Sequence, residues 1–103
     1  PTSESQSVKL FGKEINQDEL TYSDSQYMAW ANALYVAMDG WGTDEDAIYS
    51  ILGQLRTKSD WFRLVKDFGV REKQDLISWL NSELNSSERA IVNSILKKFE
   101  SSI

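Results

Sequence analysis

The chain has 103 residues, of which 41% are hydrophobic and 26% are charged, which is enough apolar material for one core and too little for a second domain. Its net charge of −5 opposes binding to nucleic-acid backbones, and it opposes binding to anionic membranes unless a divalent cation bridges the repulsion. The chain contains no Cys and no His, which excludes disulfides, Cys-ligated zinc and Ser-His or Cys-His catalysis, so we expect a non-enzymatic protein.

The N-terminal part of the sequence has the least regular pattern. Residues 1–7 are polar and rich in Ser, which favours a mobile arm. For residues 8–20 we expect an extended segment with a bend at Gly12, laid over a helical body, and a short strand pair is the alternative. We therefore assign residues 1–22 to an N-terminal arm or extended segment and residues 23–103 to a folded domain.

Two amphipathic helices are predicted next. The first begins at one of residues 23–25, any of which can cap it, and it stops at Gly40. Thr43 is predicted to cap the second helix, and the carboxylates of residues 44–46 favour the positive end of its dipole. The apolar residues at helical spacing are Tyr27, Trp30, Ala31, Leu34, Ala37 and Met38 in the first helix and Ile48, Ile51, Leu52 and Leu55 in the second.

Three further helices complete the predicted domain. Ser59 is predicted to cap the third, which Gly69 ends, and the fourth is predicted over residues 71–84. Residues 85–87 supply the break and the cap before the fifth. The predicted buried residues are Trp61, Leu64, Val65, Phe68, Leu76, Ile77, Trp79, Leu80, Leu84, Ile91, Val92, Ile95, Leu96 and Phe99. Five short helices cannot bury these stripes singly, so we expect an all-α, compact five-helix bundle.

Two stretches of the sequence resemble the annexin repeat. Residues 38–48 (MDGWGTDEDAI) resemble its first interhelical loop and second helix, and residues 75–84 (DLISWLNSEL) resemble the end of its fourth helix. Glu83 follows Thr43 by 40 positions, close to the separation in the family. The resemblance covers about residues 26–99, which is the length of a single repeat. An isolated repeat of this kind is similar to modules found in bacterial and phage proteins. It implies an annexin-repeat-like arrangement of the five helices.

The resemblance also implies a calcium site. Annexins hold calcium with backbone carbonyls of the first loop and with a carboxylate from the later loop, and the matching positions are Met38, Gly40, Gly42 and Glu83. Calcium takes roughly six to eight oxygen ligands, and glycines allow carbonyls to turn toward the ion. Trp41 would stand at the loop tip, where an amphipathic ring suits a membrane interface or a partner surface.

Each of these residues also has a purely structural explanation. Gly40 and Gly42 suit any tight turn between helices. Thr43 followed by the carboxylates of residues 44–46 is a sufficient helix cap, worth about 1 kcal/mol, so we do not count these carboxylates as ligands. Glu83 on its own can be a solvated carboxylate, and the tryptophan of the loop can pack on a neighbour.

The leading functional hypothesis is a helical interaction module that acts as a structural or docking component of a larger assembly, such as a virion. A single repeat leaves exposed the faces that sibling repeats cover in annexins, so we expect a protein partner or a homo-oligomer. The alternative is calcium-dependent phospholipid binding through residues 40–43 and Glu83, in which an anionic membrane is a partner only with calcium. We expect no nucleic-acid partner and no cofactor other than calcium.

The expected location follows from hydropathy. No apolar run approaches the ~20 residues needed to span a bilayer, and the first residues lack the basic stretch and apolar core of a signal peptide. We therefore expect a soluble chain without a conventional signal peptide or transmembrane segment. A cytoplasmic or virion-associated location fits this expectation.

Overall fold

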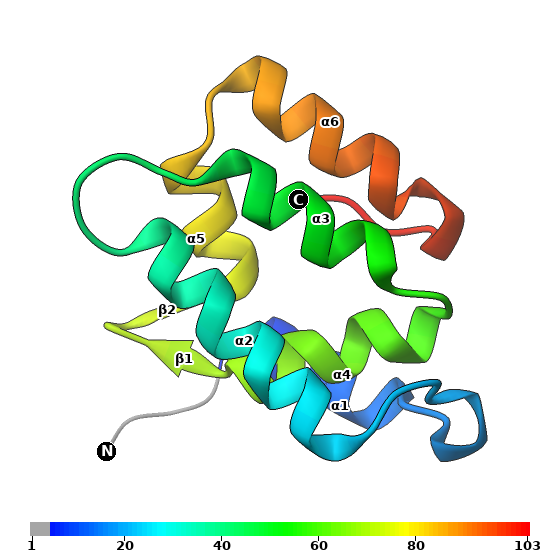
Figure 1. The fold of residues 1–103 in the computed structure, drawn as a ribbon. Helices are drawn as coiled ribbons and strands as arrows, with labels where there is room; N and C mark the ends of the chain where they lie inside the picture. Colours follow the sequence, from blue (N-terminus) through cyan, green and yellow to red (C-terminus); the bar gives the residue numbers. More distant parts are fainter. Residues whose placement is uncertain (1–4) are drawn as a thin grey trace.

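The arrangement of the chain is described for residues 5–103 by a computed structural model (Figure 1). These residues form six α-helices, two short 3-10 helices and one two-stranded antiparallel sheet. The α-helices are α1 (Gln6–Glu14), α2 (Asp24–Met38), α3 (Glu45–Gln54), α4 (Lys58–Phe68), α5 (Leu76–Glu83) and α6 (Ser86–Leu96). The other elements are η1 (Gln17–Glu19), β1 (Val70–Arg71), β2 (Gln74–Asp75) and η2 (Lys97–Phe99). The predicted all-α class is confirmed, but the described chain has six α-helices instead of five.

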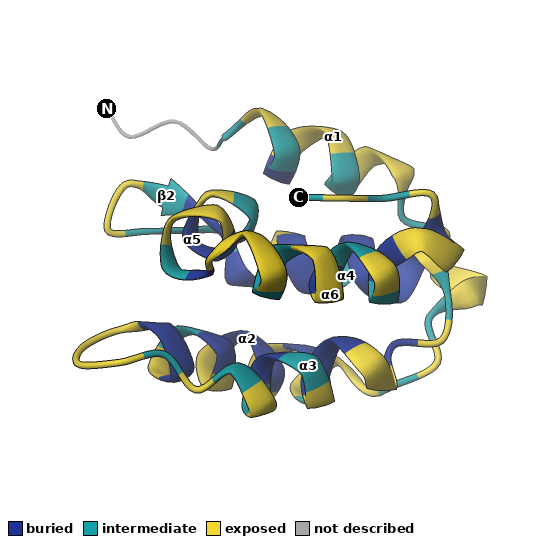
Figure 2. Ribbon diagram, turned by 90° about the horizontal axis from the view of Figure 1, so that it is seen from above, coloured by how far each residue is buried: buried dark blue, intermediate teal, exposed yellow. Residues whose placement is uncertain are grey.

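Helix α4 lies at the centre of the molecule. Helices α1 and α2 both pack against it, and α3 lies beside α2 and contacts α6. Figure 2 shows these layers edge-on, with α2 and α3 in one layer, α4, α5 and α6 in the next, and α1 on the far side. The outer faces of α1 and of the α2–α3 layer therefore point in opposite directions.

The core is built from the apolar stripes of the five predicted helices. Nearly all the residues predicted to be buried are buried, while Ile77 and Ile95 are partly buried. Ile91 is the exception, because 45% of it is exposed on α6. Helix α6 packs mainly against one other helix, α3, so only part of its apolar side is covered. Ile91 lies on the uncovered part and is exposed to solvent.

The prediction of an extended segment over residues 8–20 is wrong. Residues 6–14 form α1, and the side chain of Ser5 caps it by accepting a hydrogen bond from the Val8 amide at 3.3 Å. Phe11 anchors α1 on α4, because its ring centroid lies 4.7 Å from that of Phe62. A helix with one buried apolar face satisfies its own backbone, which an isolated extended segment does not.

The predicted mobile arm over residues 1–7 is only partly covered by the structure. Residues 1–4 lie outside the described part of the chain. Residues 5–7 belong to the cap and first turn of α1. Ser7 donates a hydrogen bond to the carboxylate of Asp75, which ties the start of α1 to the start of α5.

The cap of α3 differs from the prediction by one residue. Asp44, and not Thr43, is the cap, because its carboxylate accepts a hydrogen bond from the Ala47 amide at 3.1 Å. The amide of Asp44 in turn donates to the carbonyl of Ala37 at 2.9 Å and closes the loop between α2 and α3. Asp and Thr are both good N-cap residues, so their cap preferences do not explain the difference. The hydrogen bond from the Asp44 amide to Ala37 places Asp44 at the N-cap position of α3.

The cap of α4 also differs from the prediction. Thr57 caps this helix in a capping box with Asp60, whereas Ser59 lies inside the first turn and is buried. The Ser59 hydroxyl accepts a hydrogen bond from the Asn16 amide at 2.9 Å. Ser59 therefore fastens the segment after α1 to α4. The predicted caps at Ser23 and Asn85 and the predicted C-cap at Gly69 are confirmed, whereas α2 ends at Met38, two residues before the predicted stop at Gly40.

Residues 70–75 form a β-hairpin, although the sequence predicted helix from Arg71. Its paired residues are Val70 with Asp75 and Arg71 with Gln74. The turn residues Glu72 and Lys73 have φ angles of 50° and 70°, a left-handed conformation that no α-helix continues through. Helix α5 therefore begins only after the hairpin, with Asp75 as its cap.

Candidate functional site

The loop of residues 39–44 carries most of the predicted site. Met38 is buried and ends α2, whereas Gly40 and Gly42 are exposed, with φ angles of 108° and 71°. A Cβ atom on either glycine would meet nothing within 4 Å, so space is not what requires glycine here. The positive φ angles require it, since side chains other than glycine are strained in that region.

Trp41 stands at the tip of this loop. Its relative exposure is 105%, so it makes no contact that shields it within residues 5–103. The other three tryptophans of the chain, Trp30, Trp61 and Trp79, all belong to the core. A fully exposed aromatic side chain is costly to hydrate and is typical of a contact surface.

Glu83, the predicted carboxylate ligand, is half-buried at the end of α5. Helix α5 and the loop of residues 39–44 lie at the same end of the molecule in Figures 1 and 2. Within residues 5–103, no three His, Cys, Asp or Glu side chains gather as a metal site. The predicted calcium set contains only one such side chain and three backbone carbonyls, so it is of a different kind and stays a prediction.

The outer face of α2 is the second feature of this region. From residue 25 to residue 38 the helix contains no charged residue. Its exposed positions are Ser25, Met28, Ala29, Asn32, Ala33 and Val36. Val36 is 73% exposed and Met28 is 43% exposed. An outer helix face that has no charged residue of its own and exposes two large apolar side chains resembles a surface that another molecule covers.

We name the exposed apolar residues of α2 and its loop, Met28, Ala29, Ala33, Val36 and Trp41, the α2 surface. Sequence reasoning found Trp41 but missed the residues of the helix. Their exposure depends on which side of α2 faces α4. The absence of charge over residues 25–38 was the signal that could have revealed them.

The α2 surface lies in a strongly acidic part of the chain. Residues 14–55 contain eight Asp and Glu residues and no Lys or Arg, a charge of −8. The rest of the chain contains all 11 Lys and Arg with the other eight of the 16 Asp and Glu, a charge of +3. Beside α2, the hairpin adds one charge of each sign, because Arg71 donates to Asn32 at 3.0 Å and Glu72 accepts from Tyr35 at 2.6 Å. Three of the eight carboxylates of residues 14–55 lie outside α2 and α3, because Glu14 belongs to α1 and Asp18 and Glu19 belong to η1. Residues 24–55, which form α2, α3 and the loop between them, contain the other five and no Lys or Arg, and Asp24 among them is paired with Arg63 of α4. The acidic charge of this layer is therefore concentrated in residues 39–46.

Asp60 is the most deeply buried carboxylate among the described residues, and its partners are structural. It accepts hydrogen bonds from the Thr21 amide at 2.9 Å, from the Thr21 hydroxyl at 2.6 Å and from the Arg56 amide at 3.0 Å. The Tyr27 hydroxyl also donates to it. Burial alone would raise the pKa of Asp60, but the donors Thr21 and Tyr27 favour the charged form and hold that pKa below its ordinary value. Such a carboxylate is a poor proton acceptor.

Comparisons with known proteins give no assignment: no protein-family model, no curated protein and no solved structure matches the chain. No pocket is found in the described part of the chain. None of its helices is both long enough and apolar enough to cross a membrane. The resemblance to an annexin repeat therefore stays a prediction, and the exposed surface carries the functional argument.

Proposed function

We propose that this chain is a non-enzymatic helical interaction module that docks another protein through the α2 surface, as a structural component of a larger assembly such as a virion. The observation that supports the proposal is the exposure of Met28, Val36 and Trp41 on one uncharged helix face and its adjoining loop. Burying apolar area yields about 25 cal/mol per Å², so covering these side chains favours association. The absence of His and Cys also favours a binding role over catalysis.

The charges around the α2 surface select the chemistry of the partner. The loop and the start of α3 carry four carboxylates, those of Asp39, Asp44, Glu45 and Asp46. An acidic partner would be repelled, whereas a partner with Lys or Arg around an apolar centre gains both hydrophobic and electrostatic complementarity. We therefore propose a basic, amphipathic protein surface as the class of partner.

The experiment is a titration of the chain with a labelled synthetic helical peptide that carries leucines on one face and lysines on the other, followed by fluorescence anisotropy. We expect saturable binding that weakens as salt is raised, because screening reduces the charge attraction. A peptide with glutamate in place of lysine should not bind. No saturation with the lysine peptide, or equal binding of both peptides, would contradict the proposal.

Two substitutions give a matched control for this titration. Met28→Ser and Ile91→Ser remove apolar side chains of similar exposure, 43% and 45%, and neither changes the net charge. Met28 belongs to the α2 surface, whereas Ile91 lies on α6. The first variant should bind the lysine peptide several-fold more weakly, and the second should bind like the parent.

Calcium-dependent phospholipid binding is the second candidate function. It is favoured by the exposed Trp41 between two glycines with positive φ angles, an arrangement suited to carbonyl ligation beside a membrane-inserting ring. The test is co-sedimentation with phosphatidylserine vesicles in millimolar calcium or chelator, for the parent, Glu83→Gln and Trp41→Ala. Pelleting that requires calcium and is lost in both variants supports this function. Pelleting that is absent throughout excludes it.

A further inference from the structure

The face opposite the α2 surface is also exposed, and its charge is of the other sign. On α1, Leu10 is 50% exposed, and the exposed charged residues near it on the same helix are Lys9, Lys13 and Glu14. Lys66 of α4 adjoins this helix, because its Cδ atom lies 3.9 Å from the position of a Cβ atom on Gly12. None of the three lysines forms an ion pair within residues 5–103. We name Leu10 with these three lysines the α1 surface.

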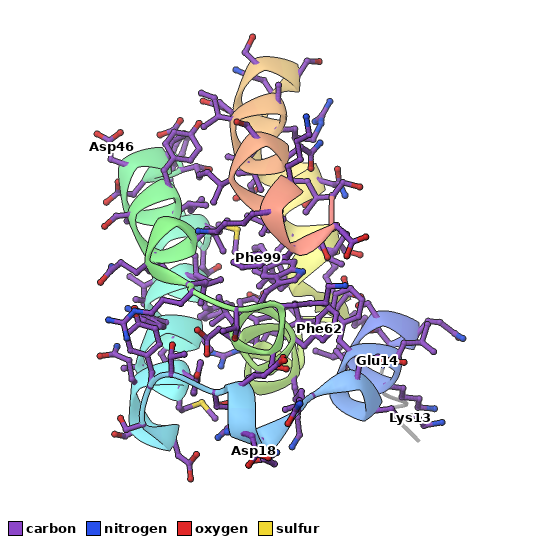
Figure 3. All side chains as sticks on the ribbon, turned by 90° about the vertical axis from the view of Figure 1, so that its right-hand side faces the viewer. Lys13, Glu14, Asp18, Asp46, Phe62 and Phe99 are labelled. Carbon is purple, nitrogen blue, oxygen red and sulfur yellow. The ribbon has the colours of Figure 1, made fainter. Side chains whose placement is uncertain are left out.

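The two surfaces lie on opposite sides of the molecule. Figure 2 places α1 on the side of α4 away from α2 and α3. In Figure 3, Lys13 points outward on the side of α1, and Asp46 lies at the opposite edge, on α3. The chain therefore presents an exposed leucine near three lysines and one glutamate on one side, and exposed apolar side chains near the carboxylates of the loop between α2 and α3 on the other.

We propose that a second copy of this chain is the partner, and that the α1 surface of one molecule docks on the α2 surface of the next. This inference rests on the proposed function and names its partner. Pairing two α2 surfaces would oppose carboxylates, and pairing two α1 surfaces would oppose lysines. Only the unlike pairing brings Leu10 against Met28 and Val36 and brings opposite charges together.

The net charge of −5 does not prevent this contact. Repulsion between whole molecules is screened over a Debye length of about 8 Å at physiological salt, while charges in the contact are closer than that. Because the contact uses two different surfaces on opposite sides, each bound pair still exposes one free surface of each kind. Association is therefore heterologous and continues into rows or rings of molecules instead of stopping at a dimer.

The experiment is sedimentation velocity of the full chain over a concentration series at physiological and high salt, with one variant for each surface. The α1-side variant is Lys9→Glu with Lys66→Glu, and the α2-side variant is Met28→Ser with Val36→Ser. All four positions are exposed. Circular dichroism and the urea midpoint of each variant should match the parent, and Lys13→Glu replaces Lys9→Glu if α1 is lost. Ile91→Ser is the control.

We expect the parent to form species larger than a dimer at high concentration and physiological salt, and these species should dissociate at high salt. Each variant alone should lose these larger species, because one of its two surfaces no longer binds. The decisive sample is a mixture of the two variants. Each still has one intact surface, and these are complementary, so the mixture should form one-to-one pairs that do not grow further.

Three results would overturn the inference: a parent that stays monomeric, variants that associate like the parent, or a mixture that forms no pairs. Dimers that are lost only in the α2-side variant would also overturn it, because they would indicate pairing of like surfaces. If the parent stays monomeric but the lysine peptide still binds to the α2 surface, the proposed function stands and only the identity of the partner is wrong.

Discussion

The phenol of Tyr27 donates a hydrogen bond to the carboxylate of Asp60, which links the first turns of α2 and α4 inside the core. The same phenol accepts hydrogen bonds from the amides of Thr21 and Tyr22, at 3.2 Å each. One buried carboxylate and one phenol thus fix the chain where it leaves η1 and enters α2. This joint positions α2, and with it the α2 surface, against α4.

Replacing Asp60 by Asn should lower the free energy of unfolding by about 3 kcal/mol, because an amide nitrogen then faces buried donors that the second carboxylate oxygen had satisfied. Urea unfolding followed by circular dichroism measures the change. Asp24→Asn is the control, since the side chain of Asp24 is 89% exposed and its ion pair with Arg63 is at the surface. Equal effects of the two substitutions would show that the buried network contributes little.

Acid should destabilise the protein partly through Asp60. The folded-state pKa of Asp60 is lowered, so its contribution is present above the unfolded-state pKa of about 4 and is lost as the pH falls through the folded-state value. Asp75 contributes to the pH dependence in the same direction. Burial raises its pKa, but the hydrogen bonds from Ser7 and the Ser78 amide have the larger effect, so the pKa of Asp75 is below its ordinary value. The unfolding free energy of the parent should therefore fall below about pH 4. Asp60→Asn should show a shallower fall, and an unchanged slope would contradict the assignment.

The start of α3 gives a prediction at single-residue resolution. Asp44→Ala should cost about 1 kcal/mol, because the Ala47 amide loses its acceptor. Thr43→Ala should change the urea midpoint little, since the Thr43 side chain caps no helix in the structure. If Thr43→Ala were the more damaging of the two, the cap would lie one residue earlier, as the sequence alone predicted.

Two glycines should respond to alanine in opposite directions. At Gly69 the φ angle is 61°, so Gly69→Ala should destabilise by more than about 1 kcal/mol. Gly53 lies inside α3, without a positive φ angle, and a Cβ atom there would meet nothing within 4 Å. Gly53→Ala should therefore stabilise the protein by about 0.5–1 kcal/mol. Thermal unfolding of both variants measures the contrast, and a loss of stability at both positions would contradict it.

The sequence predicted the elements whose stability depends on local pattern. Helices α2 to α6 have regular apolar spacing and polar residues able to cap them, so their existence and their buried residues could be predicted. Helix α1 was missed because Gly12 interrupts a short pattern with few apolar residues. Its helical form depends on Phe11, which packs against Trp61 and Phe62 of α4, a contact between residues about fifty positions apart that no local window contains.

The hairpin and the α2 surface were missed for a related reason. Residues 71–75 include good helix formers, and the contacts of the hairpin with α2 are long-range, because Arg71 lies over the ring of Tyr35 and donates to the side-chain oxygen of Asn32. The exposure of Met28 and Val36 likewise depends on which side of α2 faces α4. The uneven distribution of charge along the chain could have been predicted, because the absence of Lys and Arg from residues 14–55 can be read from the sequence alone.

The burial of three tryptophans has a practical consequence for work on this protein. Because Trp30, Trp61 and Trp79 lie in the core, their emission should report only on unfolding. Trp41 alone is open to a water-borne quencher such as acrylamide. The native chain therefore contains its own optical probe at the tip of the candidate surface, and protection of that single indole would signal that the tip is covered, without any label.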